Sequence, residues 1–129
     1  MTRLSQIQGP ISYTYTVPAA TILATPTWAL GSVPDNCVVT AVKLIPDDAV
    51  TANASHNFIF TLKNGSTSVA SRTWAATDSV AVTGEAMTLS ATLANRNLVA
   101  GDTLTLARSV TGNGLASGRF TVVVTVQVR

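Results

Sequence analysis

Hydrophobic and polar residues alternate along most of this chain with a period of two. Successive side chains of a β-strand point to opposite faces, so this period predicts strands that are buried on one side. The clearest example is the last segment, residues 119–129, where one face carries Phe120, Val122, Val124, Val126 and Val128. A long apolar strand at this position predicts that the C-terminal strand is central in its sheet.

A second strong signal lies in residues 58–74, FIFTLKNGSTSVASRTW. Two alternating segments flank the pair Asn64-Gly65, which readily adopts the positive φ angles of a tight turn. We therefore predict a β-hairpin here.

Shorter alternating runs, separated by clusters of Gly, Pro, Asn and Asp, fill most of the remaining sequence. Further strands are predicted at residues 12–17, 21–30, 37–45, 85–94 and 103–110. Residues 49–57 fit either a loop or a short helical turn. About eight closely spaced strands without a convincing helix indicate an all-β sandwich or barrel. An immunoglobulin-like sandwich shares these features, but its cysteine and tryptophan spacing is missing.

The length of 129 residues suits one domain. Residues 1–11 are polar and end in Gly9-Pro10, and we interpret them as an extended N-terminal arm. Residues 12–129 are then expected to form a single β-sandwich domain.

The surface is expected to be poor in charge, because only 11% of the residues are charged while 47% are hydrophobic. An ordinary soluble domain has about 25% charged residues. Such a surface suits dense packing against neighbours, which favours a component of an assembly over a freely diffusing enzyme. The net charge of +2 comes from scattered Lys and Arg residues, so we expect no nucleic-acid partner.

No targeting or membrane segment is visible. The first residues, MTRLSQIQGP, lack the apolar stretch of a signal peptide, and no run approaches about 18 apolar residues. We expect synthesis in the cytoplasm, a soluble product and no membrane partner. The single cysteine, Cys37, excludes an internal disulfide and is predicted to be a small buried side chain.

Residues able to perform chemistry are few. His56 is the only histidine and lies in a polar segment without a nearby nucleophile and base, so we expect no catalytic residues and no enzyme. Asp47-Asp48 fits a solvated turn better than a calcium site, because no D-x-D-x-D spacing accompanies it. The segment Gly112-Asn113-Gly114 leads into a strand and is read as a turn, not a phosphate loop. We expect no metal and no cofactor.

The aromatic residues are candidates for contacts. Trp28 and Trp74 are expected to fill a core made otherwise of smaller side chains. Tyr13 and Tyr15 share one face of the first predicted strand, where a core role and an interface role remain open.

Several segments in order resemble a known family. They are VVTAVKLIPDDAVTANASHNFIFTLKNG (38–65), SVASRTW (68–74) and AMTLSATLANRNLVAGDTLTLARSVTGNGLA (86–116). Together they resemble a jelly-roll-like β-sandwich domain of tailed-phage virions, found in capsid decoration (cement) proteins and in some head- or tail-fibre proteins. The resemblance covers residues 38–124. A proline expected before the last strand is replaced by Ser117-Gly118.

The resemblance implies a jelly-roll-like antiparallel sandwich without catalytic residues. It implies a structural virion protein that binds the outside of the phage head, clamps neighbouring subunits of the major capsid protein and forms a homo-oligomer, with a trimer favoured. The arm would reach neighbouring subunits, with contacts from Ile7, Ile11, Tyr13 and Tyr15. The protein would be made in the host cytoplasm and reside on the capsid surface. The alternative is a glycan- or receptor-binding module of a head or tail fibre, which predicts exposed aromatic rings beside Asp or Asn.

Overall fold

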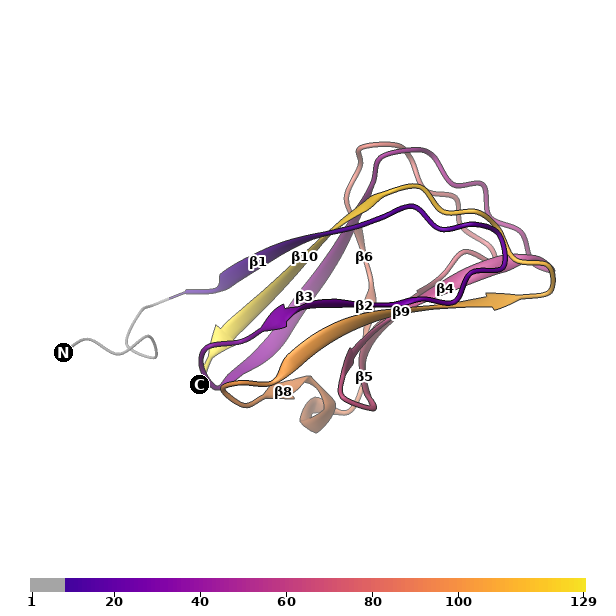
Figure 1. The fold of residues 1–129 in the computed structure, drawn as a ribbon. Coiled ribbons are helices and arrows are strands. Elements are labelled where there is room, and N and C mark those ends of the chain that lie inside the picture. Colours follow the sequence, from indigo (N-terminus) through magenta and orange to yellow (C-terminus); the bar gives the residue numbers. More distant parts are fainter. Residues whose placement is uncertain (1–8) are drawn as a thin grey trace.

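Ten strands form two antiparallel sheets that pack face to face in the computed structural model, which describes residues 9–129 (Figure 1). The strands are β1 (Ile11–Val17), β2 (Thr27–Ser32), β3 (Cys37–Pro46), β4 (Asn57–Asn64), β5 (Thr67–Thr73), β6 (Glu85–Ala86), β7 (Thr88–Leu89), β8 (Asn97–Leu98), β9 (Thr103–Thr111) and β10 (Phe120–Val128). A 3₁₀ helix, Leu93–Arg96, precedes β8. The all-β sandwich predicted from the sequence is confirmed.

The strand order is that of a jelly roll. One sheet has the order β1-β10-β3-β6, with β8 also paired to β3, and the other has the order β2-β9-β4-β5-β7. β6 and β8 lie along the same edge of β3 and together occupy the place of one interrupted strand. The chain alternates between the sheets in its first four strands, as in the paired Greek keys of this fold. β10 lies between β1 and β3, which confirms the predicted central position of the last strand.

The core lies between the sheets and contains an aromatic cluster. Phe58 stacks on Trp74 with ring centroids 4.3 Å apart, and Phe60 and Phe120 contact both rings edge-on or tilted. Trp28 is partly buried and meets Phe60 edge-on at 5.9 Å. The expected core position of both tryptophans is therefore confirmed, with Trp28 at its margin. Cys37 is buried, as predicted.

The structure corrects two predicted strands. Residues 85–94 do not form one strand, because the chain crosses between sheets within them: the Met87 N–H donates to the carbonyl of Val42 in one sheet, and the Ser90 N–H donates to Val69 in the other. The predicted strand at 21–30 begins only at Thr27 and continues to Ser32, since residues 18–26 form a loop. Residues 49–56 contain no helical turn.

The N-terminal boundary also differs slightly from the prediction. Ile11 pairs with Val126 and belongs to β1, so the first strand begins one residue earlier than expected. Residues 1–8 of the predicted arm, Ile7 among them, lie outside the described residues.

Candidate interaction site

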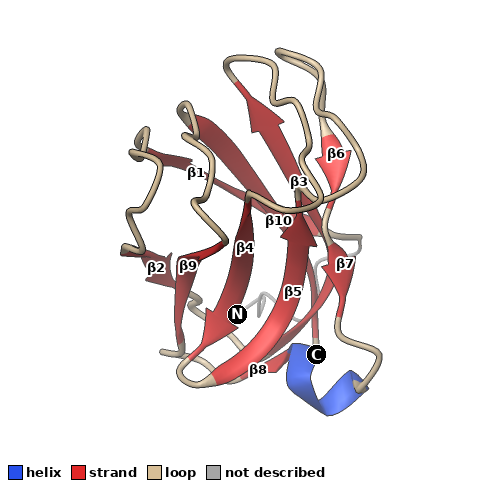
Figure 2. Ribbon diagram, turned by 90° about the vertical axis from the view of Figure 1, so that its right-hand side faces the viewer, coloured by secondary structure: helices blue, strands red, loops and turns tan. Residues whose placement is uncertain are grey.

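Four loops gather at one end of the sandwich, and the start of β1 and the C-terminus lie at the other end (Figures 1 and 2). The loops are residues 18–26 (β1–β2), 47–56 (β3–β4), 74–84 (β5–β6) and 112–119 (β9–β10). We call this end the loop end. Its loops are tied together by backbone contacts, including an isolated bridge between Ala20 and Ser117.

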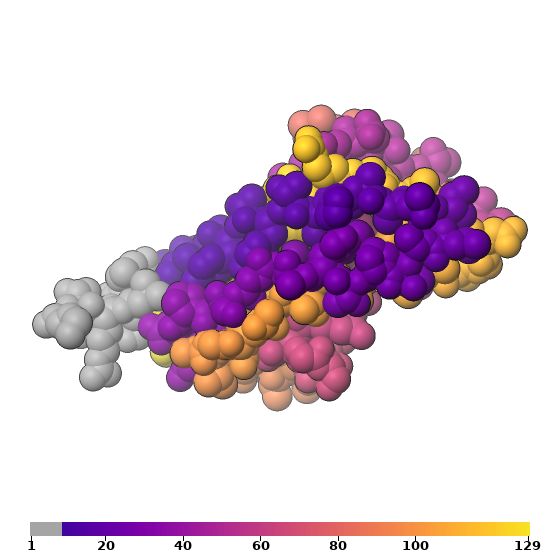
Figure 3. All heavy atoms as spheres, viewed as in Figure 1, coloured from indigo at the N-terminus to yellow at the C-terminus, as the bar shows by residue number. Residues whose placement is uncertain are grey.

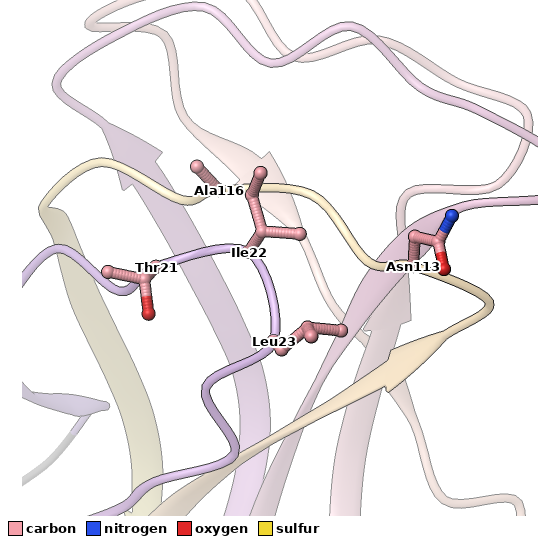
Figure 4. A pocket seen from close by; sticks show the side chains of 5 residues that line it. All are labelled: Thr21, Ile22, Leu23, Asn113 and Ala116. Carbon is pink, nitrogen blue, oxygen red and sulfur yellow. The ribbon is translucent and has the colours of Figure 1, made fainter.

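An open apolar groove of about 630 Å³ lies between two of these loops (Figure 4). Thr21, Ile22 and Leu23 line it from the β1–β2 loop, and Asn113 and Ala116 line it from the β9–β10 loop. Ile22 is 52% exposed and Leu23 is 64% exposed. Large aliphatic side chains at this exposure are typical of contact surfaces when they are grouped.

Arg108 holds the two loops that form the groove. Its guanidinium donates to the carbonyls of Ala24 (2.5 Å) and Leu115, and its Nε donates to Ser117 Oγ at 3.1 Å. The residue is only 2% exposed, and its charged end lies 4.8 Å from the centre of the Phe58 ring. Burial lowers the pKa of this arginine below its ordinary value. The loops are therefore fixed from inside the protein, which leaves their apolar side chains outside.

The spacing of residues in the sequence indicates that Arg108 is buried, although the overall composition does not. Arg108 follows Leu104 and Leu106 at a spacing of two, so it belongs to the inward face of β9. By composition alone, Arg108 is one of the scattered Lys and Arg residues that give the net charge. A charged residue in phase with a buried face indicates a buried polar network.

A second arginine holds the β5–β6 loop. Arg72 forms an ion pair with Glu85 at 2.5 Å and lies 4.6 Å from the centre of the Trp74 ring. Its Nη2 and the Trp74 Nε1 both donate to Ser79 Oγ, at 3.2 and 2.7 Å. Val82, in the same loop, is 77% exposed and has a φ of 57°, an unfavourable angle for a β-branched residue.

His56 contacts the β9–β10 loop and not an acid. Its Nδ1 accepts a hydrogen bond of 2.9 Å from the backbone N–H of Asn113. Asp47, upstream in the same loop, pairs instead with Arg119 at 2.8 Å.

Within residues 9–129, no three His, Cys, Asp or Glu side chains gather in a group able to hold a metal ion. No helix in this part of the chain is long and apolar enough to span a membrane.

The predicted interface residues of β1 face the core. Ile11, Tyr13 and Tyr15 alternate with exposed Ser and Thr residues and pack partly buried against the core. Tyr15 covers Gly31 of β2, where an added Cβ would lie 3.2 Å from the ring. Burial raises the pKa of both tyrosines. The structure brings these three residues together on one strand, and their interface role stays a prediction.

β1 is also an open edge of the sandwich. It pairs with β10 on one side, and no backbone hydrogen bond within the described residues engages its other side. The strand has seven residues, ISYTYTV, without a charge or an internal proline. Figure 3 shows β1, the following loop and β2 as one continuous surface in indigo and purple. The second sheet ends in β2, whose pairing with β9 is interrupted by a bulge between Ala29 and Gly31. The opposite edges of the two sheets consist of the two-residue strands β6, β7 and β8.

No protein-family model and no curated protein sequence matches this chain. Among solved structures, a structure of infectious bursal disease virus, Gx strain, contains a similar chain with 15% identity and a TM-score of 0.29. The match covers 95% of the present chain and 37% of the viral chain.

Proposed function

We propose that this chain is a structural virion protein, a decoration (cement) protein. It binds the outside of a tailed-phage head and clamps neighbouring subunits of the major capsid protein. It is not an enzyme, and it acts as a homo-oligomer, with a trimer favoured. In this proposal it is made in the host cytoplasm and resides on the capsid surface.

The observation that carries the proposal is the difference between the edges of the sandwich. Natural sheets usually protect an edge with charges, prolines, bulges or very short strands. The edges formed by β6, β7 and β8 are protected in this way, because each strand has two residues. The edge strand β2 is also uncharged, but it carries a bulge between Ala29 and Gly31. The edge of β1 keeps seven uncharged residues in unbroken register and directly follows the N-terminal segment. Such an edge suits the addition of an extended strand from a partner protein.

The exposed side chains also favour a protein partner over a glycan. The large exposed hydrophobic residues described are all aliphatic: Ile22, Leu23, Val80, Val82, Leu93 and Val99. No aromatic residue in the described part of the chain is exposed. A glycan-binding module usually offers exposed rings on which sugars stack, so the alternative function lacks this platform here. Many weak contacts repeated over a shell give high avidity without a single strong site.

Co-sedimentation with empty phage heads tests the proposal. The full chain should pellet with heads at a saturating, fixed ratio to the major capsid protein, and native mass determination should give a small oligomer. Thr14→Lys places a charge on the open edge and should weaken binding at least about tenfold, because edge lysines oppose strand addition. Ala41→Lys is the matched control, since Ala41 is exposed on the same sheet but lies in the interior strand β3.

Deletion of residues 1–10 tests the arm separately. The deletion leaves β1 complete, so the fold should remain and binding to heads should be lost. If the Thr14→Lys variant and the chain without residues 1–10 both bind heads as well as the full chain does, the edge and the arm are excluded as contacts. Absence of any pelleting, together with saturable binding on a glycan array, would replace the decoration function with the receptor-binding alternative.

A further inference from the structure

The contact between His56 and the β9–β10 loop is built by an ordered turn. The Asn53 side-chain oxygen accepts hydrogen bonds from the backbone N–H groups of Ser55 and His56, both at 2.9 Å. This turn fixes the backbone from which the imidazole projects. The ring then accepts the Asn113 N–H through Nδ1 at 2.9 Å. The β3–β4 and β9–β10 loops are thus joined through one ring nitrogen.

The two loops approach each other closely at Gly112. This glycine has a φ of 59°, and an added Cβ would lie 2.3 Å from the Ser55 carbonyl oxygen and 2.5 Å from His56 Nδ1. A side chain at this position would push the loops apart, so the close approach depends on glycine. Both loops are therefore shaped for this contact, one by the Asn53 turn and the other by Gly112.

We propose that His56 is a pH-sensitive latch between the β3–β4 and β9–β10 loops. A ring nitrogen accepts a hydrogen bond only while it carries no proton, and both nitrogens of an imidazolium are donors. Protonation would place one N–H against another, which breaks the link to Asn113. Histidine ordinarily changes charge between pH 5 and 8, so mild acidification is the signal. This inference does not depend on the proposed function.

The surrounding charges do not replace this link. The charged groups on the elements around the contact are Asp47, Asp48, Asp78, Arg108 and Arg119. Asp47 pairs with Arg119, the Asp78 carboxylate accepts the Ala52 N–H, and Arg108 is held by carbonyls. Residues 112–118 carry no titratable side chain. In the described chain, no carboxylate forms an ion pair with the imidazole.

Loss of the hydrogen bond between His56 and Asn113 should loosen one wall of the apolar groove. The same loop supplies Asn113 and Ala116 to the groove wall, and it supplies the Leu115 carbonyl and Ser117 to Arg108. The core strands are not part of the contact. Protonation should therefore loosen one wall of the groove while the sandwich stays folded.

Amide hydrogen exchange of the whole protein tests the latch. The protection factor of the Asn113 amide, corrected for the intrinsic rate, should fall at least about tenfold between pH 7.5 and 5.0, the range of histidine titration. The amide of Val124, in the central strand β10, should keep its protection. His56→Asn is the matched variant, because its side-chain oxygen can replace Nδ1 as an acceptor without titrating. In His56→Asn the protection factor of the Asn113 amide should change less than about twofold over the same pH range.

Two results would overturn the proposal. One is an Asn113 amide with equal protection at both pH values in the natural sequence, and the other is an equal fall in His56→Asn. A second measurement needs no variant. The nitrogen chemical shifts of His56 at pH 8 should show the proton on Nε2, and a proton on Nδ1 would contradict the hydrogen bond on which the latch depends.

Discussion

Arg108 and Arg72 occupy similar places, but their guanidinium groups have different partners. Each lies over an aromatic ring of the core and fixes a loop at the loop end. Arg72 meets a carboxylate, Glu85, and remains partly exposed, with 12% of its side chain accessible. Arg108 is almost fully buried, and its partners are neutral carbonyl and hydroxyl oxygens. The pair separates the effect of an ion pair from that of a buried hydrogen-bond network.

The two arginines also differ in how many of their nitrogen donors form hydrogen bonds. Arg108 donates through Nε and both terminal nitrogens, whereas the hydrogen bonds of Arg72 come from Nη2. Within residues 9–129, the buried Nε of Arg72 has no hydrogen-bond partner. A planar guanidinium is suited to several acceptors at once, and a lysine cannot reproduce this arrangement. We therefore expect Arg108 to be the more important residue for stability, although it has no acidic partner.

Replacement of Arg108 by Ala should cause the largest loss. The change leaves the carbonyls of Ala24 and Leu115 without their donor and opens a cavity above Phe58. We expect the free energy of unfolding in urea to fall by about 3–5 kcal/mol, because the unpaired carbonyls and the cavity both cost stability. Arg108→Lys should still lose about 2 kcal/mol, because one ammonium cannot reach all the acceptors. A loss below about 1 kcal/mol in Arg108→Ala would show that the network adds little.

Arg72→Ala should have a smaller effect, about 1–2 kcal/mol, because the ion pair is partly exposed and solvent weakens it. Glu85→Gln should lose about 0.5–1 kcal/mol, and the double variant should show coupling of similar size. Salt distinguishes the two arginines. At 1 M salt the coupling between Arg72 and Glu85 should shrink, while the effect of Arg108→Ala should stay, since its acceptors are neutral. Equal salt dependence at both sites would remove the distinction.

The sandwich could be predicted from the sequence because most strands bury one face against a single core, which produces a clear alternation of apolar and polar residues. In residues 119–129 every second side chain is apolar, and β10 indeed buries that face. The same rule failed for residues 85–94, where the alternation is real but β6 and β7 belong to different sheets. A period of two reports which face is buried, and it does not report which sheet pairs with the strand.

The site was much less predictable than the fold. The acceptors of Arg108 are backbone carbonyls of Ala24 and Leu115, and every residue type carries such a group. The hydrogen bond from Asn113 to His56 likewise joins positions 57 residues apart through a backbone N–H. Contacts of this kind depend on how two loops meet, so no residue pattern encodes them. The shared face of Tyr13 and Tyr15, by contrast, followed directly from alternation and is confirmed.

The loops held by the two arginines also differ in how they form positive φ angles, and this difference gives the smallest expected effect. The Arg108 loop uses Gly112 and Gly114, whereas the Arg72 loop places Val82 at a φ of 57°. A left-handed conformation costs a residue with a Cβ about 1–2 kcal/mol, and Asn tolerates it better. Val82→Asn should therefore raise the free energy of unfolding by about 0.5–1 kcal/mol. The control is Val80→Asn, at an exposed position of the same loop without a positive φ, which should bring no gain. Equal changes in both variants would attribute the gain to lower surface hydrophobicity, and a loss in Val82→Asn alone would mean that the valine side chain stabilises the loop.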